Sequence, residues 1–154
     1  MCFKKKENPS PPLSLGRIES GELYTILQAA FPRVNPTLAI KLGSAAWELT
    51  SVDEYKRFLK WYRDTHKYTW DEYDCNVYGW VMTAEALKWM HGKFPWGYIW
   101  AGSNDPEYPF PSHGFCFILD HEKKLYFCDE LCVAAPNDEF EPLYPVSANL
   151  IAVN

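Results

Sequence analysis

Two residue types with catalytic potential occur where a thiol hydrolase would need them. Cys75 stands in the stretch "WDEYDCNVYGW", at the start of a helical pattern, and His113 heads the β-type run of "SHGFCFILD". At the first turn of a helix, free backbone N–H groups and the positive end of the dipole favour a thiolate. We therefore interpret Cys75 as a candidate nucleophile whose own backbone N–H can help to bind an oxyanion.

A carboxylate on the next predicted strand can complete this arrangement. By strand alternation, His113 shares a face with Phe115, and Asp129 shares a face with Phe127. If both apolar faces meet the helix that begins at Cys75, Asp129 lies on the side of His113 and can orient the imidazole. A register slip of one residue would put Glu130 in that position instead.

Each of these residues also has a purely structural interpretation, which the sequence leaves open. Cys75 is then a buried core thiol, and His113 is a strand-end histidine that bonds to a backbone carbonyl. Asp129 is then a surface carboxylate at the end of a strand. The joint placement of the three residues is what favours a catalytic group.

Three helices are predicted ahead of the strands. The first begins at Ser20 to Glu22 and ends at Pro32, and the second begins at a capping box of Ser51 and Glu54. Its buried stripe is predicted to consist of Tyr55, Phe58, Leu59 and Tyr62.

The third predicted helix carries the candidate nucleophile. It runs from Cys75 to about Met90, with Asp74 as its N-cap and Gly92 closing it. Apolar residues surround it on all sides, which is typical of a buried helix. We expect this helix to be the centre of the domain.

The second half of the chain is predicted to form an antiparallel sheet. The β-type runs are "GYIWAG", "GFCFILD", "LYFCDEL" and "SANLIAV", and "DHEKK" predicts a hairpin between the second and third. The earlier stretch "TLAIKLGSAAWEL" is interpreted as a loop with extended pieces. Helices followed by antiparallel strands indicate the α+β class.

Composition bounds the class of protein. The 154 residues are 47% hydrophobic, enough for one core, and residues 1–16 are polar and proline-rich. We predict a flexible tail over 1–16 and a single domain over 17–154.

A net charge of −5 argues against a nucleic-acid partner. The chain has neither a signal-type apolar segment nor the ~20 apolar residues of a membrane span, which favours a soluble cytoplasmic protein without a membrane partner. Oligomeric state is not indicated.

Cysteines and aromatic residues raise two further possibilities. Five cysteines without an export signal favour free thiols over disulfides. A structural zinc site would use tight Cys-pair turns, which are absent around the possible ligands Cys116, Cys128, Cys132 and His121. No metal or cofactor is therefore expected. Aromatic residues near the candidate pair either line a substrate groove or pad an irregular loop. The groove candidates are Trp70, Tyr73, Trp96 and Trp100.

The stretch "YDCNVYGW" resembles the Asp-Cys-Asp-Asp-Phe-Ala signature of bacterial and phage transglutaminase-like cysteine proteins of papain-like fold. In that family a cysteine opens a buried helix, a histidine heads a strand, and an acidic residue follows on the next strand. Cys75, His113 and Asp129 match this order, whereas Asn76 and Val77 replace the two acidic positions. The resemblance covers residues 52–131.

The resemblance implies a cysteine hydrolase or acyltransferase that acts on an amide or peptide bond without a cofactor. The alternative is a non-catalytic binding protein that keeps the papain-like fold and uses an aromatic groove for its ligand.

Overall fold

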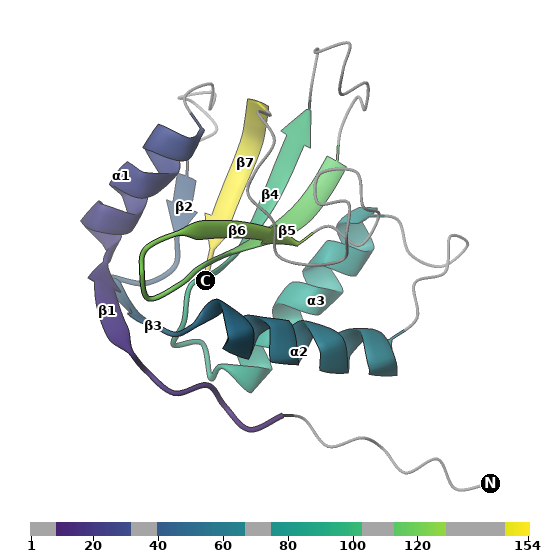
Figure 1. The fold of residues 1–154 in the computed structure, drawn as a ribbon. Helices are drawn as coiled ribbons and strands as arrows, with labels where there is room; N and C mark the ends of the chain where they lie inside the picture. Colours follow the sequence, from purple (N-terminus) through teal and green to yellow (C-terminus); the bar gives the residue numbers. More distant parts are fainter. Residues whose placement is uncertain (1–8, 32–39, 67–74, 103–112, 129–146) are drawn as a thin grey trace, which may run out of the picture.

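The computed structural model describes residues 9–31, 40–66, 75–102, 113–128 and 147–154, with the backbone alone for 75, 76, 101, 102, 113 and 147–150. The architecture is α+β, as predicted (Figure 1). In chain order the elements are β1 (Gly16–Glu19), α1 (Ser20–Ala30), β2 (Ile40–Leu42), β3 (Ala46–Leu49), α2 (Val52–Thr65), α3 (Cys75–Trp89), β4 (Trp96–Gly102), β5 (His113–Leu119), β6 (Leu125–Cys128) and β7 (Ser147–Val153).

The main sheet is mixed rather than antiparallel throughout. Within the described residues its strand order is β2-β7-β4-β5-β6, and β1 and β3 form a separate antiparallel pair. Strands β7, β4, β5 and β6 are antiparallel neighbours, whereas β2 and β7 are parallel, with Ile40 opposite Ile151. The prediction is therefore wrong at this edge, because the long connection that includes α2 and α3 allows β7 to run in the same direction as β2.

Both faces of the main sheet are buried. Phe115, Phe117 and Leu119 of β5 belong to a core shared with α1, β1 and β3, while Cys116 and Ile118 belong to a second core shared with α2 and α3. Figure 1 shows α1 on one side of the sheet and α2 with α3 on the other. This arrangement differs from the single helix-covered face assumed in the sequence analysis.

Helix α2 has the predicted stripe but not the predicted cap. Its buried residues are Tyr55, Phe58, Leu59 and Tyr62. Ser51 is the N-cap residue, yet its side chain makes no capping hydrogen bond, and the Glu54 carboxylate accepts a hydrogen bond from Arg57 instead. The capping-box prediction is therefore wrong, although the helix begins where it indicated.

Helix α3 lies on the sheet with one side open to solvent. Its buried residues include Tyr78, Met82 and Ala86, whereas Val77 is 43% exposed and Trp80 is 48% exposed. The prediction of a helix buried on all sides is therefore wrong. The end is as predicted, because Gly92 has a positive φ of 67° and its N–H donates to the Leu87 carbonyl at 2.9 Å.

The segment before β1 is attached to the domain from residue 9 onward. Arg57 Nη2 and Trp89 Nε1 each donate to the Ser10 carbonyl at 2.8 Å, and Pro12 is buried. The Leu15 N–H donates to the Leu49 carbonyl at 2.7 Å. The predicted flexible tail is therefore wrong for residues 9–16, while residues 1–8 lie outside the described part.

The β5–β6 hairpin is confirmed, and Asp120 organises its turn. The Asp120 Oδ1 atom accepts hydrogen bonds from the backbone N–H groups of Glu122 and Lys124, each at 2.9 Å. Lys123 adopts a positive φ of 63° between them. The side-chain bonds of the aspartate therefore hold a tight connection between two strands whose faces are both buried.

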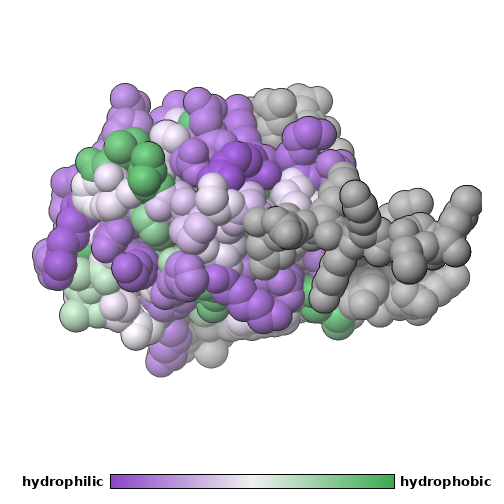
Figure 2. Space-filling model, turned by 90° about the horizontal axis from the view of Figure 1, so that it is seen from below, coloured by the Kyte–Doolittle hydropathy of each residue, from purple (hydrophilic) through white to green (hydrophobic). Residues whose placement is uncertain are grey.

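The surface is largely hydrophilic where Figure 2 shows it from below. Large apolar side chains that are nevertheless exposed include Leu13 and Leu15 before β1 and Val77 and Trp80 on α3. Among the described helices, none is long and apolar enough to cross a membrane.

Candidate functional site

Helix α3 and strand β5 begin at the same end of the sheet. Helix α3 is followed directly by β4, which packs against it and runs back along the sheet, and β5 is antiparallel to β4. The helix and β5 therefore run in the same general direction, and both start at the upper right of Figure 1. These two starts are the positions of Cys75 and His113.

The contacts of Gly79 show which residues of β4 and β5 lie under the second turn of α3. A Cβ atom on Gly79 would lie 2.8 Å from the Tyr98 ring, and the Cys116 thiol donates to the Gly79 carbonyl at 3.5 Å. Tyr98 and Cys116 are register partners on β4 and β5. Gly79 therefore marks where α3 crosses this pair.

One turn before Gly79, about 6 Å along the helix, is the backbone of Cys75. Two residues before Cys116, about 6.8 Å along the strand, is Gly114. Because α3 and β5 run in the same general direction, these two offsets place the backbone of Cys75 toward the end of β5 that carries Gly114 and His113.

The face of β5 that meets α3 is not the one expected from the sequence. The sequence prediction required the face of Phe115 and Phe117 to meet the helix of Cys75, but that face packs in the core with α1. The face that meets α3 carries Cys116 and Ile118. Strand alternation therefore gives no support to a pair formed by Cys75 and His113, and the pair stays a prediction that rests on the common end of the sheet at which α3 and β5 begin.

Four predicted site residues lie outside the described part of the chain. These are Trp70, Tyr73, Asp129 and Glu130. The carboxylate candidates come directly after Cys128, the last residue of β6, which is the register partner of Cys116. The role assigned to either carboxylate stays a prediction.

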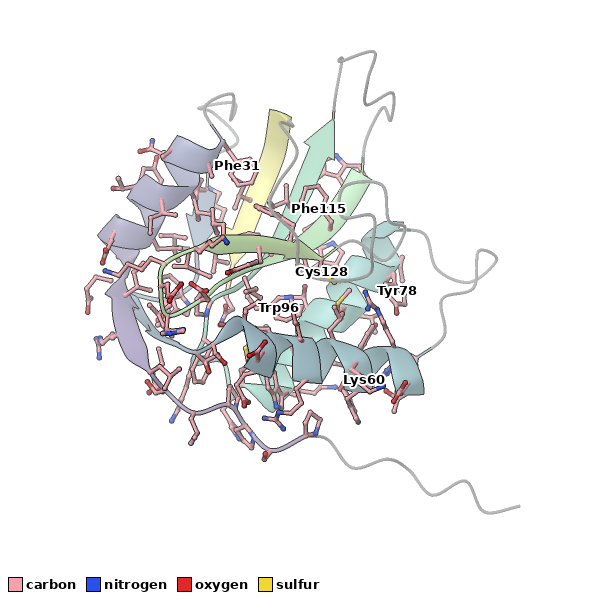
Figure 3. The ribbon with its side chains drawn as sticks, in the orientation of Figure 1. Phe31, Lys60, Tyr78, Trp96, Phe115 and Cys128 are labelled. Atoms are coloured by element: carbon pink, nitrogen blue, oxygen red, sulfur yellow. The ribbon has the colours of Figure 1, made fainter. Side chains whose placement is uncertain are left out.

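The two described groove candidates differ in burial. Trp96 has no exposed surface and packs between α2 and the sheet, with its ring 5.3 Å from that of Phe58 (Figure 3). It is a core residue, and its predicted role in substrate binding is wrong because a substrate cannot reach it. Trp100 is half-buried against the same core, at the level of the first turn of α3.

Trp80 is an exposed aromatic residue that sequence analysis did not single out. Its ring stacks on Tyr98 of β4, with 4.4 Å between centroids and an interplanar angle of 25°. It stands five residues after Cys75 on the same helix. Because its neighbours in sequence are also apolar, periodicity carried no signal that this face of α3 is open to solvent.

A small polar group lies between α3 and β5. Thr83 Oγ1 donates to the Gly79 carbonyl at 2.8 Å and lies 3.5 Å from the Cys116 thiol. These contacts hold the second turn of α3 on β5. Across the described ranges, no three histidine, cysteine or acidic side chains gather as metal ligands would.

The comparisons with known proteins give a likeness of fold. No family model and no curated protein matches the chain. A solved structure described as "PSL1a-E64 complex" is similar, with a TM-score of 0.67 and 11% sequence identity. The match covers 88% of this chain and 51% of that one, so the present chain corresponds to about half of that protein. The likeness is one of fold.

Proposed function

We propose that the chain is a cysteine hydrolase or acyltransferase of papain-like fold, acting on an amide or peptide bond. The observation that carries the proposal is that α3 begins at Cys75 and β5 begins at His113, at the same end of the sheet (Figure 1). The fold likeness supports it, because E64 is an inhibitor of cysteine proteases. The transglutaminase-like subtype rests on the resemblance of the "YDCNVYGW" motif.

In the proposed reaction, the Cys75 thiolate attacks the carbonyl carbon and forms a tetrahedral oxyanion. The backbone N–H of Cys75 is one donor to that oxyanion. Protonated His113 then gives its proton to the departing amine, leaving a thioester on the cysteine. Water or a second amine, deprotonated by His113, attacks the thioester and releases the thiolate. Asp129 is the proposed orienting carboxylate, with Glu130 as its alternative.

Alkylation by iodoacetamide near neutral pH tests the proposal, with peptide mapping to locate each modified thiol. A Cys75 thiolate paired with His113 is expected to react on the order of tenfold faster than Cys2 or than Cys75 in the urea-unfolded chain. Replacing His113 by Ala should remove most of that advantage. His121→Ala is the matched control, because His121 is exposed in the β5–β6 turn.

A smaller effect is expected for Asp129→Asn, since an orienting residue affects the ring and not the thiol directly. If folded Cys75 reacts no faster than Cys2 and His113→Ala changes nothing, the catalytic function is wrong. The exposed stack of Trp80 on Tyr98 favours a binding function for that outcome. Loss of ligand-induced tryptophan fluorescence change in Trp80→Ala would then identify the binding surface.

A further inference from the structure

Two cysteines lie directly opposite each other on neighbouring strands. Cys116 of β5 and Cys128 of β6 are register partners, and both are buried. They share the sheet face that packs against α2 and α3, and Figure 3 labels Cys128 beside that helical layer. Neither thiol belongs to the proposed catalytic group.

The hairpin geometry places these cysteines at a separation that a disulfide can bridge. The Asp120 N–H donates to the Lys124 carbonyl at 3.1 Å, which marks a hydrogen-bonded pair. Such pairs alternate along an antiparallel ladder, so the Cys116–Cys128 pair, four positions further, is of the same kind, with Cα atoms about 5.5 Å apart. Disulfides most often join Cα atoms about 5.5–6 Å apart.

The same geometry indicates a bond that is easily reduced. Directly opposite Cβ atoms in a sheet are about 4.5–5.5 Å apart, whereas a disulfide holds them at about 3.8 Å. Forming the bond therefore draws β5 and β6 together and strains the ladder. Strained disulfides have more oxidising potentials than structural ones, and they are the labile class.

An oxidant can reach Cys128 through local opening of β6. Strand β6 has four residues and pairs only with β5 among the described strands, and Cys128 is its last residue. Short edge strands open at lower free energy than central ones, so the burial of Cys128 does not prevent its reaction.

We propose that Cys116 and Cys128 form a reversible oxidation site that a hydroperoxide converts to a cross-strand disulfide. The Cys128 thiolate attacks the peroxide oxygen, giving a sulfenic acid and releasing an alcohol, or water from hydrogen peroxide. The Cys116 thiol then attacks the sulfenic sulfur, the S–S bond forms, and water leaves. The two thiols lose two electrons and two protons in total, and the peroxide O–O bond is reduced.

Oxidation also alters the contact between the sheet and α3. In the reduced state the Cys116 thiol donates to the Gly79 carbonyl and contacts Thr83. A bond to Cys128 removes the S–H donor from this contact. Oxidation of this pair of cysteines therefore changes a contact that the first turns of α3 make with the sheet.

The test is treatment of the folded full chain with hydrogen peroxide, followed by alkylation of remaining thiols and peptide mapping without reductant. The expected result is a linked pair of peptides that contain Cys116 and Cys128, with the loss of two hydrogen atoms. A low concentration of dithiothreitol should restore both thiols. Cys75→Ala is expected to form the same link, so the result does not depend on the proposed catalytic function.

Two variants make the assignment specific. Cys132→Ser should leave the link intact, whereas Cys116→Ser should abolish it and leave Cys128 as a sulfenic acid that dimedone traps. A link between Cys128 and Cys132, or two thiols that stay free while the folded chain is oxidised at other cysteines, would overturn the proposal. Because the mapping is done on the unmodified chain, a variant that fails to fold does not affect the result.

Discussion

Gly97 of β4 lies beneath the ring of its register partner, Phe117 of β5. A Cβ atom on Gly97 would lie 1.9 Å from Cε1 and 2.1 Å from Cζ of that ring. Phe117 has no exposed surface, so its ring has little space into which to move. The close approach of the ring to the strand therefore depends on the absence of a side chain at Gly97.

Replacing Gly97 by Ala is expected to lower the free energy of unfolding by about 1–3 kcal/mol, because the new methyl group overpacks the core. Urea unfolding measures this change. Gly21→Ala in α1 is the matched control, since a Cβ there meets no atom within 4 Å and Ala favours a helix. An unchanged stability for Gly97→Ala would show that Phe117 can turn away at no cost.

At the scale of elements, residues 9–15 connect the N-terminal segment to both α2 and α3. The Ser10 carbonyl accepts hydrogen bonds from Arg57 of α2 and Trp89 of α3, and the Arg57 guanidinium lies 5.8 Å from the centre of the Trp89 ring. Pro12, two residues after Ser10, is buried. The segment therefore covers the place where the two helices meet.

Removing this segment is expected to destabilise the domain. A chain that starts at residue 16 should melt several degrees below one that starts at residue 9, because each kcal/mol lost lowers the melting temperature by about 2–4 °C in a domain of this size. Arg57→Ala should give part of that loss. Lys60→Ala, on an exposed position of the same helix, is the control and should leave the melting temperature unchanged.

Equal melting temperatures for the two shortened chains would contradict the role given to the Ser10 contacts. Differential scanning fluorimetry is sufficient to distinguish the outcomes. Because both chains lack residues 1–8, the difference between their melting temperatures reports on residues 9–15 alone.

Element type was predictable where a sequence period matched one buried face. The stripe of α2 was correct in each residue, since two charged side chains separate Tyr55 from Phe58 and one lies between Leu59 and Tyr62. In α3 the period gave no such signal, because Val77 and Trp80 are as apolar as Tyr78. Which of them is buried depends on the contacts with α2 and the sheet, which lie far away in sequence.

The candidate site was predictable in part for the same reason. The starts of α3 at Cys75 and of β5 at His113 follow from local signals, and both are as predicted. The sheet face that meets α3 could not be derived, because Phe115 and Phe117 are apolar on one face and Cys116 and Ile118 on the other. Which face of β5 packs against α3 follows from the position of α1 on the other side of the sheet.

At the scale of the whole molecule, a buried polar group joins the helical half to the hairpin. The His121 N–H donates to the Thr50 carbonyl at 2.8 Å, and the Tyr55 hydroxyl donates to the Leu119 carbonyl at 3.4 Å. Asp120 is 2% exposed within this group. Burial raises the pKa of Tyr55 above its usual value, and the negative charge of Asp120 raises it further.

This shift predicts a loss of stability at alkaline pH. Below about pH 10 the Tyr55 hydroxyl is protonated in both states, and its contribution is complete. Above that pH the unfolded chain releases the proton while the folded chain retains it, so the free energy of unfolding falls by up to about 1.4 kcal/mol per pH unit. Urea unfolding at about pH 8 to about pH 11 measures the slope, which should be smaller in Tyr55→Phe.

The two proteins should differ by a constant amount below about pH 9, where neither state titrates this group. That constant difference serves as the internal control, because it contains the loss of the hydroxyl contact with Leu119. If the alkaline slopes are equal, the phenol of Tyr55 does not carry the pH dependence.

The position of β7 has a consequence for how the chain acquires its fold during synthesis. Strand β7 lies between β2 and β4, both of which leave the ribosome long before it does. Until residues 147–153 emerge, the strand that joins β2 to the rest of the sheet is missing, and both neighbours expose backbone groups and apolar faces. The sheet of the nascent chain therefore cannot be completed until β7 has been synthesised. During that interval the edges of β2 and β4 are open to chaperones and to other chains.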